Sequence, residues 1–480
     1  MKYLFDRLQA YKNEDIYPFH MPGHKRQVLE GQGYFAYDIT EIPGFDDLHH
    51  PEGILREAMD RAAMAYGSDR TFFLVNGSTA GILAAINSVY MQSQKKGKLL
   101  LARNSHKSAY NALLLTGMDA EYLYPSYLAA FHLNGGIAPA AVEDVLSKKQ
   151  NENGNDIAAV LITSPTYDGI ISDIEAIVEI AHHYKVPVIV DEAHGAHFAF
   201  EQEGNGSALK SGADMVINSL HKTLPCMTQT ALLHVNSQLI DINAVKQSLQ
   251  IFQTSSPSYV LMSSIDECIR YMMKEGKSFC DNRVKLRNTF DYLTRDLQKL
   301  KIVSCDIIAK SDIKGFDSGK IIVSTINTNI NGEELYERLL KEFGLQMEMS
   351  APDYVLGILT GADTKEGIIR FAEALRCIDN DIDFDLKEEK KYTMSYHNDR
   401  AMSIASANCC DKERVSLDLA VGRVACEYVY AYPPGIPVIV PGEIINESIV
   451  QYIREYMNLG LSVRGLSDET NQTMLVTGNN

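Results

Sequence analysis

The sequence predicts an α/β protein with a three-layer, mostly parallel sheet, followed by two smaller α+β units. From residue 52 onward, short β-branched runs alternate with stretches of helical periodicity, which is the pattern of parallel α/β folds. The chain also has 480 residues, 45% of them hydrophobic and 22% charged, so it can bury a large core in two to four domains. A disordered tail and a peptide-sized scaffold are excluded.

The first predicted elements are a helix, a strand and a second helix. Apolar residues recur at three-to-four spacing between Ile54 and Tyr66, which indicates one helix face. The run Thr71–Val75 is typical of a strand, and the turn Asn76–Thr79 leads into a helix predicted over Ala80–Tyr90. The same alternation predicts strands over Lys98–Ala102, Ala158–Thr163, Val186–Val190 and Met215–Asn218, and helices over His106–Leu115 and Ile174–His183.

The pattern changes after about residue 275. A charged helical stretch, two strand-like runs and two further helices are predicted over Lys277–Leu300, Ile302–Ile308, Lys320–Ser324, Gly332–Phe343 and Lys365–Ile378. The charge-dense segment Asp379–Lys391 predicts an exposed linker. We therefore expect an amino-terminal arm (1–50), a large domain (51–275), a small α+β domain (276–390) and a carboxy-terminal unit (391–480).

The net charge limits the class of partner. With 45 Lys and Arg against 62 Asp and Glu, the formal charge is 45 − 62 = −17, which repels both a phosphate backbone and an anionic membrane surface. We expect neither nucleic acid nor a membrane as a partner, and an acidic surface suits a cationic small molecule. The longest apolar runs, such as Ala158–Ile162, fall far short of the roughly 20 residues of a membrane helix.

The cysteines and the amino terminus predict a cytoplasmic protein. Lys2, Asp6 and Arg7 interrupt the segment where a signal peptide needs an apolar core. The eight cysteines include no CxxC pair, so we expect reduced thiols that mainly pack in the interior.

Lys222 is the first candidate for chemistry. The tetrapeptide Ser219–Lys222 directly follows the predicted strand Met215–Asn218, so Lys222 is expected at the carboxyl edge of the sheet, where ligands of open α/β sheets bind. A lysine held among apolar residues can become an uncharged nucleophile and form a Schiff base. Taken alone, the position also suits an ordinary surface lysine.

Asp191 is the last residue of the strand-like run Val188–Asp191 and precedes Lys222 by 31 positions. A carboxylate at a strand end can pair with a pyridinium nitrogen and keep pyridoxal phosphate protonated as an electron sink. The alternative is an aspartate that caps the next helix.

A third signal is the turn Gly77-Ser78-Thr79 between a strand and a helix. Free backbone N–H groups and the helix dipole can hold a phosphate there, although an ordinary helix cap explains the same residues. Thr254 to Ser256 offer further hydroxyls, or simply form a polar turn. A phosphate turn, a partner for a pyridine nitrogen and a lysine, in this order on one α/β pattern, indicate a pyridoxal phosphate site.

These residues belong to a set of motifs that resembles the bacterial Orn/Lys/Arg decarboxylases of pyridoxal phosphate fold type I, the aspartate aminotransferase-like fold. The motifs are Asn76–Thr79, Asn104–Ser108, Ser164–Gly169, Asp191–His194 and Ser219–Lys222, flanked by Phe19–Lys25, Asp47–Pro51 and Tyr432–Gly435. The similarity covers almost the whole chain. It does not include the receiver-like amino-terminal wing of the large inducible enzymes, so the shorter Gram-positive-type arginine/lysine decarboxylases are the nearer match.

The resemblance implies a role for each matching residue. Lys222 would form the internal aldimine, Asp191 would pair with the pyridine nitrogen, and His106 would stack on the ring, although His106 alone also suits a packed or capping histidine. The further cofactor contacts that it implies are Ser78, Thr79, Ala80, Ala193, His194, Ser219, His221 and Thr254, the last of these reaching the phosphate of the partner subunit. The glycine turn is one residue shorter than in the large enzymes, so the phosphate oxygen met by each hydroxyl stays open.

The resemblance also implies the reaction: decarboxylation of a basic L-amino acid, with arginine to agmatine expected first and lysine (to cadaverine) or ornithine as alternatives. His221 and Lys222 are both candidates for the proton donor to Cα. The acidic side chains that could bind the basic end of the substrate are Glu41, Asp46, Asp47, Glu427 and Glu443, each of which is equally read as a surface charge. We expect at least a homodimer, because fold type I sites are built between two subunits, and a place in polyamine biosynthesis.

Specific residues of the sequence are also compatible with other functions. A fold type I aminotransferase or acyltransferase predicts a late arginine for the substrate carboxylate, for which Arg370 and Arg376 are available. A binding protein without activity is disfavoured by the retained Lys222, Asp191 and His106.

Two further alternatives rest on short motifs. A metal-dependent hydrolase could use His194 and His197 with Asp191, or His20 with His24. A helicase is suggested by Asp191–His194, but Gly276-Lys277-Ser278 has Tyr271 where a phosphate loop requires glycine.

Overall fold

The computed structural model describes residues 3–14, 21–22, 24–25, 33–153, 156–201, 206–304, 313–385, 398–431 and 435–478, with the side chains of 150–153 left out. The chain divides into two compact units. The first contains Met1–Lys95 and Ile174–Asp281, and the second contains Lys96–Asp173 and Asn282–Asn480. The first unit has strands in the order β1-β10-β9-β8, and the second unit has strands in the order β6-β2-β3.

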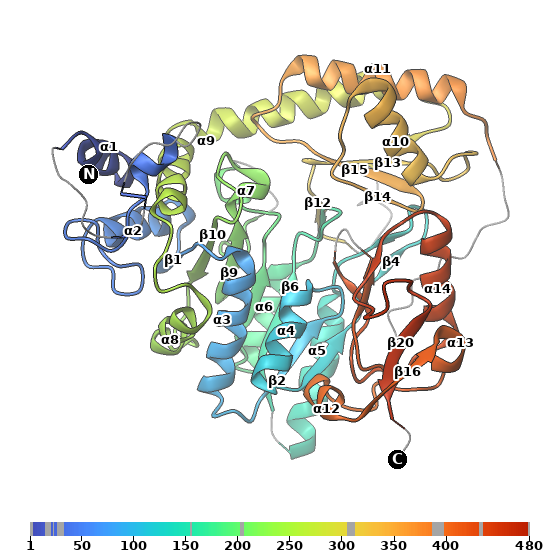
Figure 1. Cartoon of the computed structure of the whole chain (residues 1–480), viewed down its shortest axis with the longest axis horizontal. Helices are drawn as coiled ribbons and strands as arrows, with labels where there is room; N and C mark the ends of the chain where they lie inside the picture. The colour runs from blue at the N-terminus through green and yellow to red at the C-terminus, as the bar shows by residue number, and fades with distance from the viewer. Residues whose placement is uncertain are drawn as a thin grey trace. The chain divides into compact units, whose positions relative to one another are not determined.

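The first unit holds β1 (Arg70–Leu74), β10 (Ala231–Val235), β9 (Met215–Ser219) and β8 (Val188–Asp191) (Figure 1). Strand β10 pairs antiparallel with both β1 and β9, whereas β9 and β8 are parallel. Every residue of β8, β9 and β10 is buried, which explains why these segments read as continuous apolar runs. Helix α3 (Gly77–Gln92) packs on β9 and β10.

The remaining elements of the first unit are helical. They are α1 (Leu4–Asn13), η1 (Gly33–Tyr37), α2 (Ile54–Tyr66), α6 (Ile174–His183), η2 (Phe198–Phe200), α7 (Leu220–Thr223), α8 (Ile242–Phe252) and α9 (Tyr259–Thr294), the last of which continues into the second unit.

The second unit contains the parallel strands β6 (Ile157–Thr163), β2 (Lys98–Ala102) and β3 (Ala120–Leu123). Its other elements up to β7 are α4 (Lys107–Thr116), β4 (Tyr127–Leu128), β5 (Leu133–Asn134), α5 (Pro139–Asn153) and β7 (Ile170–Ile171).

Two smaller cores follow in the second unit. The first is an antiparallel sheet of β11 (Lys301–Ile302), β13 (Lys320–Ser324), β15 (Tyr354–Ile358) and β14 (Met349–Ala351), with α10 (Gly332–Phe343) and α11 (Lys365–Asp381). Strand β12 (Gly315–Phe316) pairs with β7 in a separate two-stranded sheet. The last core contains α12 (Ile404–Cys409), β16 (Lys412–Ser416), α13 (Leu417–Ala420), β17 (Val429–Ala431), β18 (Pro437–Ile439), α14 (Glu447–Asn458), β19 (Val463–Arg464) and β20 (Thr473–Thr477).

The α/β pattern predicted for the large domain is confirmed, and three details after it are wrong. The long helix begins at Tyr259 rather than near Lys277, because its apolar face already starts there. The first residues of the expected linker belong to α11, and Asp379 is buried and accepts hydrogen bonds from the backbone N–H groups of Gln298, Lys299 and Leu300. The strand expected over Ile302–Ile308 ends at Ile302, since Val303 and Ser304 are not in a strand. Residues 305–308 of that strand, residues 386–391 of the linker, and most of Phe19–Lys25 and Tyr432–Gly435 lie outside the described residues. The four-part division of the chain stays a prediction.

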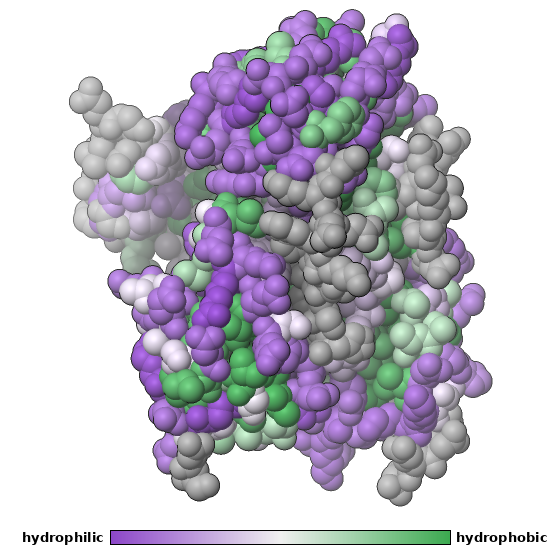
Figure 2. Space-filling view, turned by 90° about the vertical axis from the view of Figure 1, so that its right-hand side faces the viewer, coloured by the Kyte–Doolittle hydropathy of each residue, from purple (hydrophilic) through white to green (hydrophobic). Residues whose placement is uncertain are grey.

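The surface agrees with the charge of the sequence. On the face that Figure 2 shows, hydrophilic side chains predominate and hydrophobic ones form separate patches. Among the described residues, no helix is both long and apolar enough to cross a membrane, and the described cysteines are free.

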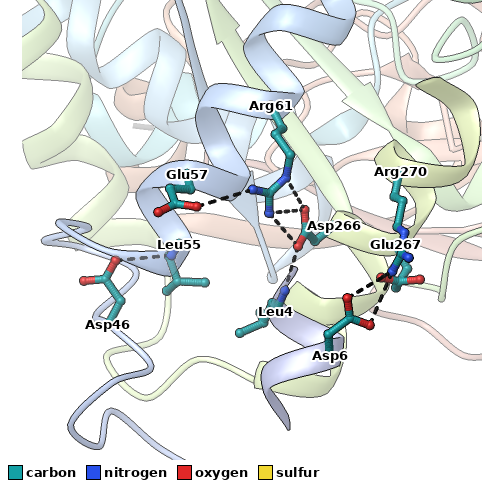
Figure 3. A network of polar contacts seen from close by, with 9 residues as sticks. All are labelled: Leu4, Asp6, Asp46, Leu55, Glu57, Arg61, Asp266, Glu267 and Arg270. Atoms are coloured by element: carbon teal, nitrogen blue, oxygen red, sulfur yellow. Dashed lines mark hydrogen bonds and ion pairs between the residues drawn. The ribbon is translucent and has the colours of Figure 1, made fainter. Parts of the chain in front are cut away.

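A buried ion pair holds the amino-terminal helix to the first unit (Figure 3). Arg61 on α2 binds both carboxylate oxygens of Asp266 on α9, with its Nη2 2.8 Å from each. Asp266 Oδ2 also accepts the backbone N–H of Leu4 at the start of α1, at 2.9 Å. Both charged side chains are almost completely buried, so each depends on the other for compensation.

We predict that Asp266→Asn destabilises the first unit by about 3 to 5 kcal/mol, because it removes the buried counter-charge of Arg61 and leaves the exposed Glu57, 3.9 Å away, as a weaker one. Urea unfolding, together with limited proteolysis of α1, measures the effect. The matched control is Asp6→Asn, which removes an exposed partner of Arg270 and should leave the unfolding midpoint nearly unchanged. Equal midpoints for the two variants would show that the buried pair is not the anchor.

Candidate active site

The direction of three strands brings the candidate residues to one sheet edge. Because β1 and β9 are both antiparallel to β10, they run in the same direction and end at the same edge. Ser219 is the last residue of β9, and Ser78 lies in the first turn of the helix that follows β1. Their hydroxyl oxygens are 2.7 Å apart, although the residues are 141 positions apart in the sequence.

The turn before α3 is held from several sides. Gly77 has a φ of +71°, a left-handed conformation that favours glycine. Gln253 Oε1 accepts the N–H of Val75 at 2.9 Å, and Gln229 Nε2 donates to the carbonyl of the same residue at 2.6 Å. The backbone N–H groups at this helix start therefore have a fixed direction, as an anion site requires. Thr79 is exposed here and Ala80 is buried.

Lys222 and Asp191 lie in the same unit, next to this edge. Lys222 Nζ donates to His194 Nε2 at 2.9 Å from the short helix α7. Asp191 is the last residue of β8, is 4% exposed, and accepts the N–H of Ala193 at 3.2 Å. Burial raises the pKa of Asp191, while the nearby charge of Lys222 and the Ala193 N–H oppose that rise. This carboxylate is therefore stabilised by any cation placed against it.

His221 is held in one orientation. Its Nδ1 donates to the carbonyl of Thr230 at 3.0 Å, so Nε2 carries the lone pair in the neutral ring. Burial lowers the pKa of His221, and the charge of Lys222 lowers it further, against the opposing effect of that hydrogen bond. The neutral form of His221 is therefore favoured near pH 7.

Two buried polar residues of this site were missed from the sequence. Glu192 Oε1 accepts the N–H of Ala208 at 2.7 Å, and its Oε2 accepts from Asn218 Nδ2 at 2.9 Å. Burial raises the pKa of Glu192 to about 8 against these hydrogen bonds. The sequence held a signal for both residues. Asn218 is an amide within a buried strand, and Glu192 directly follows a second buried strand. The supporting roles of Gln229 and Gln253 carried no comparable signal.

The structure gives His106 and Thr254 local contacts within their own units. His106 belongs to the second unit and caps α4, its Nδ1 accepting the N–H of Ser108 at 3.3 Å. Thr254 is exposed in the first unit, and its N–H donates to Asn76 Oδ1 at 3.1 Å. The cofactor roles of both residues stay predictions.

Most of the acidic candidates for substrate binding have structural partners. Glu443 is not a surface charge, because it is 0% exposed and pairs with Arg103. Glu427 is also buried and accepts two backbone N–H groups. Asp46 caps the start of α2, and Asp47 accepts from His49 and His50. Glu41 differs from the other four, since its Oε1 is buried and has no hydrogen-bond partner within the described part of the chain.

The arginines and the Gly-Lys-Ser motif named for the alternative functions lie on helices. Arg370 and Arg376 are exposed on α11. Gly276-Lys277-Ser278 lies inside α9, so it forms no phosphate loop.

The proposed metal ligands do not converge. His197 Nε2 lies 3.6 Å from Glu201, and His24 Nε2 lies 3.3 Å from Asp38, while His20 is outside the described residues. No group of three potential metal ligands occurs in the described ranges.

The pKa of Glu192 yields a pH prediction. Its pKa is raised above the ordinary value of 4.5, so the stability tied to its neutral form is complete below about pH 4.5 and is lost as the pH rises through about 8. Glu192→Gln is neutral throughout and should not lose it, so wild type should lose about 4 kcal/mol relative to this variant between pH 5 and 9. Urea unfolding across this pH range tests it, with Glu179→Gln on the exposed face of α6 as control. Parallel pH profiles for wild type and Glu192→Gln would contradict the assignment.

Comparisons with known proteins extend over the whole chain. The arginine decarboxylase of Bacillus anthracis is 32% identical over 98% of this chain and 96% of that protein. The crystal structure of a lysine decarboxylase from Francisella novicida has a TM-score of 0.82 at 19% identity, over 99% of this chain and 81% of the other. The structure of Oryza sativa TDC with PLP has a TM-score of 0.53 at 13% identity, over 68% and 74% of the two chains. The expected fold type I architecture is confirmed.

Two family descriptions match the chain in succession. Residues 3–322 match "Orn/Lys/Arg decarboxylase, major domain", and residues 387–476 match "Orn/Lys/Arg decarboxylase, C-terminal domain". Together with the identity to the Bacillus enzyme, these matches confirm that the chain is a decarboxylase and belongs to the Orn/Lys/Arg decarboxylase family.

Proposed function

We propose that this enzyme uses pyridoxal 5'-phosphate to decarboxylate a basic L-amino acid, and that arginine, which would yield agmatine and CO2, is its substrate. The observation that carries the proposal is the convergence of Lys222, the buried Asp191 and the Ser78–Ser219 hydroxyl pair within one unit. The identity with the arginine decarboxylase of Bacillus anthracis supports arginine ahead of lysine or ornithine.

The residues of the site fit the cofactor. Burial makes the ionised Asp191 costly by itself, and a protonated pyridine nitrogen is the cation that would offset this cost. The Ser78 and Ser219 hydroxyls and the start of α3 offer hydrogen-bond donors and a positive dipole end for a phosphate. Lys222 supplies the amine for a Schiff base.

Each residue has a separate task in the reaction. When bound, the cofactor supplies an electron sink for the electrons of the Cα–carboxylate bond. Asp191 holds a proton at the pyridine nitrogen and so maintains that sink. His194 Nε2 accepts the hydrogen bond of Lys222 Nζ, which orients the amine and gives its proton a place to move. After CO2 leaves, Lys222 Nζ or His221 delivers a proton to Cα.

Further roles belong to the same proposal. Thr79, Ala80 and Ala193 lie beside the residues above and would line the cofactor site, His106 would cover the ring, and Thr254 would reach the phosphate in a partner subunit. The enzyme would then be a homodimer or a larger homo-oligomer with shared sites. We place it in the cytoplasm, in polyamine biosynthesis, which the free thiols of the described cysteines support.

The basic end of the substrate would meet a carboxylate. Of the five acidic candidates, Glu41 is favoured, because the other four already hold partners of the protein itself. The net charge of −17 would also attract a cationic substrate.

The test combines cofactor chemistry and substrate choice. The purified enzyme should be yellow, and borohydride should fix the cofactor to Lys222, as peptide mass spectrometry will show. Release of CO2 from arginine, lysine and ornithine is measured in parallel, and we expect arginine to have the highest kcat/KM. Lys222→Ala should lose at least about 10³-fold in kcat, since it lacks the nucleophile.

Lys210→Ala is the control, because Lys210 is an exposed lysine of the same unit. It should leave the rate unchanged. Faster CO2 release from lysine or ornithine would show that this amino acid, and not arginine, is the substrate. No CO2 release from any of the three would overturn the proposed reaction.

A further inference from the structure

A buried cluster in the second unit connects the last core of the chain to the turn that carries His106. Arg103 directly follows β2 and lies three residues before His106, and its side chain is 0% exposed. The carboxylate and the two carbonyls that bind this guanidinium come from a segment more than 330 residues later in the chain, and Tyr110 is a nearer partner.

The guanidinium of Arg103 is bound through all three nitrogens. Nε and Nη2 each donate to one carboxylate oxygen of Glu443 at 2.9 Å, which is the strong bidentate arrangement. Nη1 donates to the carbonyl of Pro437 at 2.6 Å, and Nη2 also donates to that of Val438 at 3.1 Å. Arg103 is therefore fixed in direction as well as neutralised.

Glu443 is fixed equally well. Its Oε2 accepts from Asn398 Nδ2 and from the N–H of Val440, each at 3.0 Å, in addition to Arg103. Asn398 Nδ2 also donates to the carbonyl of Val438 at 3.1 Å. Because both charges are buried, removing one of them leaves the other uncompensated.

The backbone next to Arg103 passes this constraint to His106. The N–H of Arg103 donates to the carbonyl of Leu123 at 2.8 Å, and Tyr110 on α4 donates to the carbonyl of Arg103 at 2.5 Å. The N–H of Ser105 donates to the carbonyl of Ala102 at 3.0 Å, which closes the turn between β2 and α4. The strand end, the turn with His106 and the start of α4 are thus one hydrogen-bonded unit.

A second contact acts on the same helix. Helix α12, which follows Ser403, packs against α4, and Lys107 Nζ lies 5.5 Å from the ring centroid of Tyr430. The last core of the chain therefore contacts α4 at its start and along its length.

We propose that Glu443 is a positioning residue, which acts through Arg103 to hold the imidazole of His106 in the orientation that the cofactor site requires. The inference rests on the proposed function, in which His106 covers the cofactor ring. The carboxy-terminal segment that carries Glu443 would then have a task in the reaction. Glu443 would be buried for this task rather than available to the substrate.

The test begins with a readout that needs neither cofactor nor substrate. The full-length protein is labelled with 13C at the histidine ε1 position, and the resonance of His106 is assigned by its disappearance in His106→Gln. We expect this resonance to shift in Glu443→Gln. It should stay in place in Glu337→Gln, the control, which removes the exposed partner of Lys341 on α10 in the same unit. An unmoved His106 resonance in folded Glu443→Gln overturns the inference, whatever the enzyme does with arginine.

Kinetics of the holoenzyme give the second readout. Glu443→Gln should lower kcat by about 10- to 100-fold with KM changed less than about threefold, since only orientation is lost. The double variant with His106→Ala should be no slower than His106→Ala alone, because the two residues act as one chain of contacts. Multiplying losses would overturn the inference, while inactivity of wild type would count against the proposed function alone.

Asn398→Ala is the second variant, which is used if Glu443→Gln does not fold. It keeps the ion pair and removes one hydrogen bond to Glu443, so it should shift the His106 resonance in the same direction by less. Where Glu443→Gln does not fold, an unmoved His106 resonance in folded Asn398→Ala contradicts the proposal.

Discussion

The carboxylate of Asp191 is buried at the end of a fully buried strand, and the site is arranged around its need for a positive partner. Burial raises its pKa, and the charge of Lys222 partly reverses that rise. The same edge carries the Ser78 and Ser219 hydroxyls, because two strands that flank an antiparallel neighbour end there together. A cationic ring nitrogen, a phosphate and an amine-reactive carbonyl are the three groups that these residues complement.

A second constraint acts at the other end of the chain. Glu443 and Arg103 compensate each other without solvent, so the segment around residues 437–443 cannot leave the end of β2 without exposing a buried charge. In the first unit, Arg61 and Asp266 secure α1 in the same manner. Both pairs join segments that are distant in sequence, and both use a bidentate guanidinium.

Much of the fold followed from local pattern. Helix α6 and helix α10 have the predicted bounds, since each has a clear apolar face, and α10 has a capping box between Asn331 and Glu334. Strand β10 was missed, because its run Ala231–Val235 contains a histidine that the structure buries against Thr71. The start of α9 was misplaced, since its apolar face begins before the charged stretch. The end of α11 was misplaced, since the buried hydrogen bonds of Asp379 override its polar character.

The site was predicted to a similar degree. The order of Ser78, Asp191 and Lys222 along alternating strands indicated a common edge. The contacts Ser78–Ser219 and Lys222–His194 came from the structure and were not predicted. The pairing of Glu443 with Arg103 was not predictable, because a single sequence gives no sign of which charges meet across 340 positions. The burial of Glu192 depends on Asn218 and Ala208 for the same reason.

The most direct test of the central claim is the protonation state of the cofactor nitrogen opposite Asp191. The protein is loaded with pyridoxal phosphate labelled with 15N in the ring, and the nitrogen chemical shift is recorded between pH 6 and 9 in wild type and in Asp191→Asn. We predict a protonated nitrogen throughout this range in wild type and an unprotonated one in the variant. An unprotonated nitrogen in the wild-type enzyme, or equal shifts in the two proteins, would contradict the account.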